Sequence, residues 1–209
     1  MRVYVATKNA GKLREMEALF ADAPVELAVY PAYEPPDEGE TSYGDNAALK
    51  ARALRGQLLA AGIRAGVLAD DSGLEVEALG GRPGVTTAIY GGASASWSDR
   101  RARLLGELAT IAEPDRGARF VCVLHFIGPD GRELAATATV RGAIPAAERG
   151  RAGFSFDPVF FYPPAGRTFA ELGEEEKNRV SHRAVAAAGL IAMLATAELA
   201  TPEDGETAR

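Results

Sequence analysis

Short runs rich in β-branched and aromatic residues alternate along this chain with longer runs whose apolar residues recur at helical spacing. Arg2–Ala6 is a short β-type run, and residues 43–61 repeat apolar residues every three or four positions. Two later β-type runs, Arg119–Ile127 and Glu133–Arg141, flank Pro129-Asp130-Gly131, which is typical of a hairpin turn. Alternating strands and helices predict an α/β fold. The hairpin adds antiparallel strands, so we expect a mixed sheet.

The remaining segments extend this alternation along the chain. Residues 31–40 are rich in proline and acidic residues, and we expect them to be a loop. Ser181 is suited to cap a final helix that runs to about Leu199. The apolar stripe of the 43–61 helix consists of Ala47, Ala51, Leu54 and Leu58. The other expected elements are a helix after Gly11, strands over Val25–Tyr30, Gly66–Ala69 and Leu74–Leu79, and a helix over Trp97–Ile111.

Composition limits the class of protein. With 209 residues, of which 47% are hydrophobic and 25% charged, the chain can bury a sizeable core. No window approaches the ~18 consecutive apolar residues of a membrane span, and the first residues lack a signal-peptide pattern. A formal net charge of −6 argues against a general nucleic-acid binder. Cys122 is the single cysteine, so neither an intrachain disulfide nor a cysteine-based zinc site is expected.

These observations favour a protein of the reducing cytoplasm, with neither a membrane nor a nucleic acid as partner. A small anionic ligand stays compatible with the net charge, because a few local cations outweigh a weak global field. We expect residues 1–200 to form one domain and the polar residues 201–209 to form a flexible tail.

Lysine is scarce in this chain, whereas arginine is common. The 23 basic residues comprise 19 arginines and four lysines, namely Lys8, Lys12, Lys50 and Lys177. Arginine therefore supplies the ordinary surface charge, and a lysine marks a position where a compact point charge is useful. Chance combined with codon bias is the alternative interpretation, and composition alone does not separate the two.

The first candidate site is Thr7-Lys8-Asn9-Ala10-Gly11-Lys12, between the first expected strand and the next helix. Unpaired backbone N–H groups at a helix N-terminus attract anions, and Thr7, Asn9 and Lys12 add donors. The segment is not a Walker A loop, because leucine and arginine follow its Gly-Lys pair. An ordinary turn in which Thr7 or Asn9 caps the helix fits the same spacing.

The second candidate is Asp70-Asp71-Ser72-Gly73, at the expected carboxyl end of a buried strand. Ligands of open α/β sheets bind at such strand ends, and a carboxylate there can bind Mg²⁺ or activate a water. If the acidic loop folds over Asp71, a hard-cation site with oxygen ligands results. A turn whose side chains bond their own backbone is the alternative. The acids that could join Asp71 are Asp37, Glu38, Glu40 and Asp45.

Two further candidates lie in the last third of the chain. Gly153-Phe154-Ser155-Phe156-Asp157-Pro158 offers aromatic rings that can stack on a base, although the same rings fit a core. Farther on, Lys177 stands alone among acids, and Ser181-His182-Arg183 opens the last helix, where side chains can read the polar edges of a ligand. The other histidine, His125, lies in an apolar run and is expected in the core.

Taken together and in order, these segments resemble the inosine/xanthosine triphosphate pyrophosphatases, a family that clears nonstandard purine nucleotides. The resemblance covers residues 3 to about 195, and all four lysines fall within it. Each motif alone is weak, but the ordered set is specific. The matching stretches are Ala6–Lys12, Asp45–Ala51, Ala69–Val76, Ala78–Val85, Gly153–Pro158, Thr168–Leu172 and Glu175–Arg183.

The resemblance implies a two-lobed domain around a long mixed β-sheet with flanking helices, an active site in the central cleft, and a homodimer. It also implies Mg²⁺-dependent hydrolysis of small-molecule nucleotides (dITP, ITP or XTP) to the monophosphate and pyrophosphate. Asp71 is then the catalytic residue, as metal ligand or base, and Glu38 is the second metal ligand. The implied substrate-binding residues are Thr7, Lys8, Asn9, Ala10, Gly11, Lys12, Ser72, Phe154, Ser155, Phe156, Asp157, Lys177, His182 and Arg183.

The resemblance also suggests which part of the substrate each of these residues binds. Thr7–Lys12 and Ser72 would cradle the phosphates, and Lys177 would neutralise developing charge. Phe154 would stack on the base, whose polar edge His182 and Arg183 would read.

The sequence departs from the family's pattern at a few positions. Lys8 stands where the family often has glycine, and Asp45 replaces a common glutamate. Ser155 and Phe156 stand where glycine and tyrosine are frequent. The 37–45 loop is one residue longer than usual, which leaves the second metal ligand open between Glu38 and its neighbouring acids.

Other functions compete with this interpretation. A nucleotide pyrophosphatase for modified pyrimidines, as in the Maf-like proteins, has a related architecture, but Asp70–Gly73 and Ser181–Arg183 argue against it. A regulator that senses nucleoside triphosphates without turnover would bind tightly and release no pyrophosphate. A nucleic-acid-binding module would need a basic stripe that the sequence does not contain.

Overall fold

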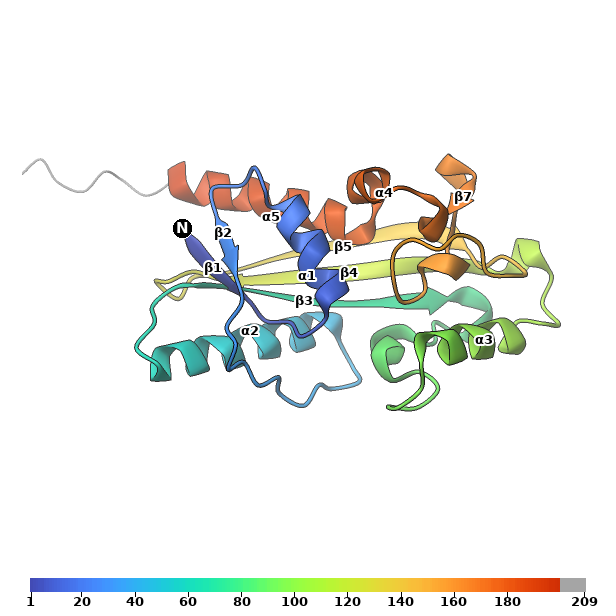
Figure 1. Ribbon diagram of the computed structural model, residues 1–209, viewed down its shortest axis with the longest axis horizontal. Coiled ribbons are helices and arrows are strands. Elements are labelled where there is room, and N and C mark those ends of the chain that lie inside the picture. Colours follow the sequence, from blue (N-terminus) through green and yellow to red (C-terminus); the bar gives the residue numbers. More distant parts are fainter. Residues whose placement is uncertain (200–209) are drawn as a thin grey trace, which may run out of the picture.

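A seven-stranded mixed sheet forms the middle layer of the protein (Figure 1). The computed structural model describes residues 1–199. The strands are β1 Arg2–Val5, β2 Glu26–Ala28, β3 Gly66–Val76, β4 Gly117–Ile127, β5 Glu133–Ala143, β6 Phe161–Tyr162 and β7 Arg167–Thr168. Their order across the sheet is β2-β1-β3-β4-β5-β6-β7. β1 pairs in parallel with β2 and β3, and every later pairing is antiparallel.

Helices cover both faces of this sheet (Figure 1). They are α1 Ala10–Leu19, α2 Tyr43–Ala60, α3 Trp97–Glu107, α4 Glu174–Val180 and α5 His182–Leu199. α1, α4 and α5 lie together on one face, and α2 and α3 lie on the other. The predicted cap of the last helix is confirmed, because the Ser181 hydroxyl accepts the N–H of Ala184. The predicted stripe of α2 is also confirmed, since the following residues are at most 1% exposed: Ala47, Ala51, Leu54 and Leu58.

The long strands β3, β4 and β5 lie among four clusters of buried side chains within residues 1–199, two of them larger than the others. Near β1 and α5, Met16, Leu68 and Leu190 belong to one core cluster. Nearer α3, Leu74 and Leu104 belong to a second cluster with the aromatic rings of the 156–169 region. The predicted fold class, a mixed sheet flanked by helices, is confirmed.

One correction concerns β3, which carries both candidate aspartates. The sequence predicts two short strands, Gly66–Ala69 and Leu74–Leu79, but β3 continues through Asp70 and Asp71. β4 pairs with it residue by residue, so the backbone stays extended through both aspartates and forms no turn there. Two other elements are shorter than expected: the 97–111 helix ends at Glu107, and the 25–30 strand spans Glu26–Ala28.

The remaining expectations concern the hairpin, His125 and the chain end. The hairpin is confirmed by the pairing of β4 with β5, and His125 is buried, with its Nε2 2.9 Å from Glu133 Oε2. None of the helices within residues 1–199 is both long and apolar enough to cross a membrane. The tail expected over residues 201–209 lies outside the described residues. The single domain expected over residues 1–200 stays a prediction.

Candidate active site

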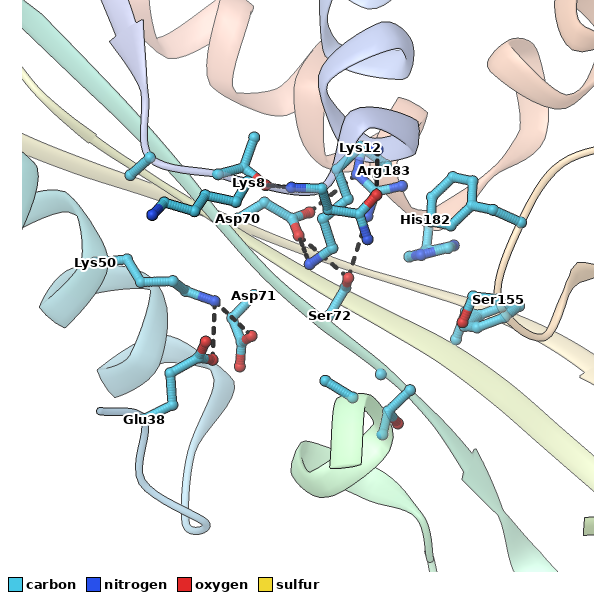
Figure 2. A pocket seen from close by; sticks show the side chains of 18 of the residues that line it. Lys8, Lys12, Glu38, Lys50, Asp70, Asp71, Ser72, Ser155, His182 and Arg183 are labelled. Atoms are coloured by element: carbon cyan, nitrogen blue, oxygen red, sulfur yellow. Dashed lines mark hydrogen bonds and ion pairs between the residues drawn. The ribbon is translucent and has the colours of Figure 1, made fainter. Parts of the chain in front are cut away.

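A cleft of about 250 Å³ opens beside the middle of β3 (Figure 2). Its walls come from the loops before α1 and α2, from β3, and from the segments around Phe154 and His182. All four lysines of the chain line it, whereas Arg183 is the single arginine of its lining within the described residues. This distribution favours the compact point-charge interpretation of the scarce lysines over chance.

The two adjacent aspartates serve opposite faces of the sheet. Successive side chains of a strand point in opposite directions, so Asp70 and Asp71 meet different partners although both line the cleft. Figure 2 shows Asp70 directed towards Lys12 and Arg183, and Asp71 towards Lys50. Because each carboxylate has its own cations, their mutual repulsion does not require a bridging metal ion.

On the α2 face, Asp71 belongs to a small polar group. Lys50 Nζ donates to Asp71 Oδ1 at 2.8 Å and to Glu38 Oε2 at 3.0 Å. Asn46 donates to Asp71 Oδ2 at 3.3 Å and also holds Gly39 through two hydrogen bonds of 2.8 Å, which fixes the acidic loop over the strand. Burial raises the pKa of Asp71 and Lys50 offsets only part of this effect. Asp71 is therefore a better proton acceptor than an ordinary aspartate.

The residues around Asp71 fit a magnesium ion that arrives with a phosphorylated ligand. Magnesium is usually held by one or two carboxylates together with waters and phosphate oxygens. Glu38 and Asp71 supply two carboxylates that Lys50 holds towards one point. Within residues 1–199, no three His, Cys, Asp or Glu side chains form a metal-binding group, so the protein part of such a site is incomplete without a ligand. Of the four acids considered in the 37–45 region, Glu38 is the one that lines the cleft.

On the other face of β3, six charged side chains form a line of alternating sign. In order they are Lys12, Asp70, Arg183, Glu15, Lys177 and Asp157. Arg183 stands near the middle, where its Nε donates to Asp70 Oδ2 at 3.0 Å and another nitrogen donates to Glu15. Lys177 Nζ donates to Glu15 Oε1 at 2.6 Å and to Asp157 Oδ2 at 2.5 Å. Three cations balance three carboxylates, which offsets the cost of burying them.

Asp70 is the most heavily hydrogen-bonded member of this charged line. Burial opposes its ionisation, but Arg183 and Lys12 outweigh burial and hold the pKa of Asp70 well below its usual range. Its four donors are Lys12, Ser72, Cys122 and Arg183. Because its oxygens are occupied, Asp70 anchors cations rather than offering a ligand for a metal ion. At the far end, burial raises the pKa of Asp157, with Lys177 offsetting part of the effect.

The loop before α1 forms the ordinary helix-capping turn that was the alternative to an anion site in the sequence. Asn9 is the N-cap of α1, and its Oδ1 accepts the N–H groups of Gly11 at 2.9 Å and Lys12 at 3.2 Å. The N–H of Asn9 in turn donates to Thr7 Oγ1 at 3.1 Å. Two of the helix N–H groups that were expected to be unpaired are thus already satisfied. The capacity of this loop to hold an anion therefore lies mainly in its lysine side chains.

The two phenylalanines of the 153–158 segment have different places. Phe154 lines the cleft, with Lys177 Nζ 4.8 Å from its ring centroid. Its N–H donates to Asp157 Oδ2 at 2.7 Å, so the buried aspartate also shapes this loop. A Cβ at Gly11 would come within 2.8 Å of the Phe154 ring, which explains the glycine there. Phe156 is fully buried and packs edge-on against Trp97.

His182 is a buried neutral group in the wall of the cleft. Its ring stacks on Phe120, with centroids 4.5 Å apart and planes 12° apart. Burial lowers the pKa of His182 well below its usual value, and the charges of Arg183 and Lys177 act in the same direction. Within the described residues its Nδ1 has no hydrogen-bond partner. A neutral imidazole can donate or accept a hydrogen bond to a ligand, depending on its tautomer.

The low pKa of His182 predicts a loss of stability in mild acid. The unfolded chain takes up a proton below about pH 6.5, whereas the folded chain does not, so stability falls as pH decreases through this range. Each pH unit costs up to about 1.4 kcal/mol until the folded-state pKa is reached. His182→Phe keeps a ring on Phe120 and should flatten the dependence of Tm on pH between about 7.5 and about 5. Equal slopes for the two proteins would contradict this assignment.

Most of the residues proposed from the sequence meet in the cleft. Those that line it are Thr7, Lys8, Asn9, Lys12, Glu38, Asp71, Ser72, Phe154, Ser155, Asp157, Lys177, His182 and Arg183. Ala10, Gly11 and Phe156 do not line it. Asp70, part of the second candidate motif, also lines the cleft. Further residues that line it or hold its charged groups were not among the predicted site residues: Glu15, Tyr33, Asn46, Lys50, Thr87 and Trp97. Lys50 carried a usable signal, because it is one of four lysines, whereas nothing in the sequence marks Glu15.

Fold and site together define a class of protein. The molecule is an α/β protein with a mixed sheet and a cleft lined by four lysines, in which the carboxylates of Asp71 and Glu38 lie beside Lys50. The sequence profile of the Ham1 family matches residues 3–193. The chain therefore belongs to the Ham1 family.

Individual relatives agree with this membership. A dITP/XTP pyrophosphatase of Geobacillus kaustophilus is 46% identical over 187 residues, covering 88% of this chain and 89% of the relative. A protein of the same name from Thermus thermophilus is 45% identical over 194 residues, covering 91% of this chain and 90% of the relative. The solved structure of the Staphylococcus aureus Ham1 protein has a TM-score of 0.80 at 34% identity and covers 94% of this chain and 100% of its own. The nucleoside-triphosphatase or dITP/XTP pyrophosphatase of Mycobacterium abscessus has a TM-score of 0.71 at 37% identity, covering 91% and 98%.

Proposed function

We propose that this chain is a pyrophosphatase for nonstandard purine nucleoside triphosphates such as dITP, ITP and XTP. It would release the nucleoside monophosphate and pyrophosphate, and so keep these nucleotides out of DNA and RNA. The observation that carries the proposal is the placement of Asp71 beside Lys50, in a cleft lined by every lysine of the chain. The names of the relatives support the same substrates.

The charges of the cleft suit a triphosphate that brings a divalent cation. Its lining holds five cations against four carboxylates, a formal excess of one positive charge, whereas a triphosphate carries about four negative charges. We propose that Glu38 and Asp71 hold Mg²⁺, which supplies the missing positive charge when it is bound. The cations are Lys8, Lys12, Lys50, Lys177 and Arg183, and the carboxylates are Glu38, Asp70, Asp71 and Asp157.

The reaction requires a water to attack the α-phosphorus. Asp71 accepts a proton from this water as the new P–O bond forms and the bond to the β-phosphate bridge breaks, which releases pyrophosphate. Lys50 orients Asp71, and Lys12 and Lys177 offset charge on the phosphates. Because burial raises the pKa of Asp71, the carboxylate holds the accepted proton better than an exposed aspartate would.

Recognition of the base falls to the wall around Phe154. Phe154 stacks on the purine, while His182 and Arg183, with backbone groups, read its edge. Hypoxanthine and xanthine have a carbonyl at C6, where adenine has an amino group. A donor placed there is satisfied by the former and left unpaired by the latter, at a cost of ~1–3 kcal/mol. We further propose that the protein works as a homodimer, as the resemblance implies, and in the reducing cytoplasm, as its single cysteine suggests; light scattering tests the dimer.

A substrate panel tests the proposed reaction. We expect pyrophosphate release in Mg²⁺ to be fastest with ITP, dITP and XTP, and much slower with the standard nucleotides and 5-methyl-UTP. The rejected adenine nucleotides should lag by about tenfold or more, because one unpaired buried donor costs that much. A preference for 5-methyl-UTP would support the proposed reaction but show that the base is a modified pyrimidine rather than a purine. Tight binding without pyrophosphate release would point to a regulator instead.

A further inference from the structure

The chain between β2 and α2 contains a strap, residues 34–39, that is fastened to α2 at both ends. At the first end, the side chain of Gln57 donates to the carbonyl of Glu34 at 2.7 Å and accepts the N–H of Glu34 at 2.9 Å. At the other end, Asn46 makes its two hydrogen bonds of 2.8 Å with the backbone of Gly39. Asn46 and Gln57 lie about three helical turns apart and so share one face of α2. The strap is therefore held against that face.

Tyr33 stands directly before the strap and is buried in the wall of the cleft. It is 3% exposed, and its ring belongs to a core cluster with Ala51 and Leu54 of α2. Its N–H donates to the carbonyl of Tyr30 at 3.0 Å, and the residue lines the cleft. Because the core holds the ring and a turn holds the backbone, the Tyr33 hydroxyl has a fixed place.

This hydroxyl is buried without a partner. Within residues 1–199 the Tyr33 oxygen makes no hydrogen bond. Buried polar groups are normally paired, since an unpaired one costs free energy. Two other buried tyrosines, Tyr43 and Tyr90, also have unpaired hydroxyls, but within the described part of the chain neither of them lines the cleft. Tyr33 is thus the tyrosine whose missing partner a ligand of the cleft could supply.

The charges near Tyr33 indicate which part of the cleft it serves. Pro35 and Glu38 of the strap line the same cleft, and Figure 2 shows Glu38 beside Lys50. Burial raises the pKa of Tyr33, while Lys50 opposes this effect and Glu38 adds to it. The hydroxyl therefore stays protonated at neutral pH and can donate a hydrogen bond. It lies within the field of the two side chains that flank the proposed cation site.

We propose that Tyr33 is a positioning residue for the divalent cation, its hydroxyl donating a hydrogen bond to an oxygen ligand of that cation beside Glu38. This oxygen belongs to a cation-bound water or to a phosphate of the substrate, and both are acceptors. The assignment rests on the proposed function, which places Mg²⁺ at Glu38 and Asp71. It adds an uncharged residue that the core and the strap hold in place without an ion pair.

Tyr33→Phe tests the assignment, because it removes the hydroxyl and keeps the ring. Calorimetry should show that pyrophosphate binds about threefold to tenfold more weakly in Mg²⁺, since one hydrogen bond is lost. If the acceptor is a cation-bound water, Mg²⁺ alone also binds more weakly. If it is a phosphate oxygen, the affinity for Mg²⁺ alone stays the same. The Tm of Tyr33→Phe should be equal or higher, because an unpaired buried hydroxyl is removed.

Tyr90→Phe is the matched control. It also removes a buried, unpaired hydroxyl, but Tyr90 packs against Phe156 in the second core cluster. Its Tm should respond in the same direction, and neither affinity should change. Kinetics with ITP give a second readout. In Tyr33→Phe the Mg²⁺ concentration for half-maximal rate should rise by the same factor as the loss of affinity, and excess Mg²⁺ should restore kcat.

Two results would overturn the assignment. One is an unchanged pyrophosphate affinity in Tyr33→Phe, and the other is an equal loss of affinity in Tyr90→Phe. Failure of the proposed function looks different, since the unaltered protein would then release no pyrophosphate from any nucleotide of the panel.

Discussion

Asp71→Asn is expected to reduce pyrophosphate release from ITP by about 10³-fold, the scale at which a general base contributes. The amide cannot accept the proton of the attacking water. It keeps an oxygen for Lys50 and stays close in shape, and only the longer hydrogen bond from Asn46, at 3.3 Å, is lost. Since burial already raises the pKa of Asp71, removal of its charge should not lower the stability of the fold. The measurement is kcat with saturating ITP, together with Tm.

A comparison with Glu38→Gln separates the two roles considered for Asp71. Glu38 is the other carboxylate on Lys50, so the two changes are chemically matched. If Glu38 only holds Mg²⁺, excess Mg²⁺ should recover much of the activity of Glu38→Gln. Asp71→Asn should stay inactive at every Mg²⁺ concentration. More than a tenth of normal kcat in Asp71→Asn, or its rescue by Mg²⁺, would remove the role of Asp71 as base.

The sequence predicted which residue types line the cleft better than it predicted the direction in which their side chains point. Four lysines among 23 basic residues already marked the walls of one site, and all four line the cleft. Amphipathic spacing located α2, and Pro129–Gly131 located the hairpin, because both are local patterns with a direct physical cause. Asp71 lies at the cleft, as its motif predicts, but within the continuous strand β3 rather than just after the end of a strand.

What the sequence could not supply depends on contacts between distant residues. Continuous β3 turns Asp70 and Asp71 to opposite faces, so one aspartate anchors cations while the other stays beside Lys50. Glu15 contacts Lys177 and Arg183 across 162 and 168 residues, and no local pattern predicts such pairs. Phe154 and Phe156 have identical side chains two residues apart, yet Phe154 lines the cleft and Phe156 packs in the second core cluster. Only tertiary packing distinguishes the two positions.

Arg183→Met is expected to destabilise the protein by about 3–5 kcal/mol, the cost of breaking a buried ion pair from one side. Arg183 is 1% exposed and holds three acceptors through separate nitrogens: Asp70, Glu15 and Ser72. Its loss leaves three carboxylates against two lysines in the charged line. At about 2–4 °C per kcal/mol for a chain of this size, Tm should fall by roughly 6–20 °C. Arg183→Lys should recover little, because one ammonium cannot reproduce the planar fork.

The charge balance of this line gives a sharper test than the single variant. Adding Glu15→Gln to Arg183→Met leaves Lys12 with Asp70 and Lys177 with Asp157, two cations against two carboxylates. If the penalty of Arg183→Met comes from unbalanced buried charge, the double variant should be more stable than the sum of the single changes predicts, by about 1–3 kcal/mol. Additive losses in denaturant unfolding would mean that Arg183 stabilises the fold through packing alone. A positive coupling would instead show that the alternating charges act as one unit, so that Glu15, remote in sequence and outside the cleft, sets the electrostatics of the residues that line it.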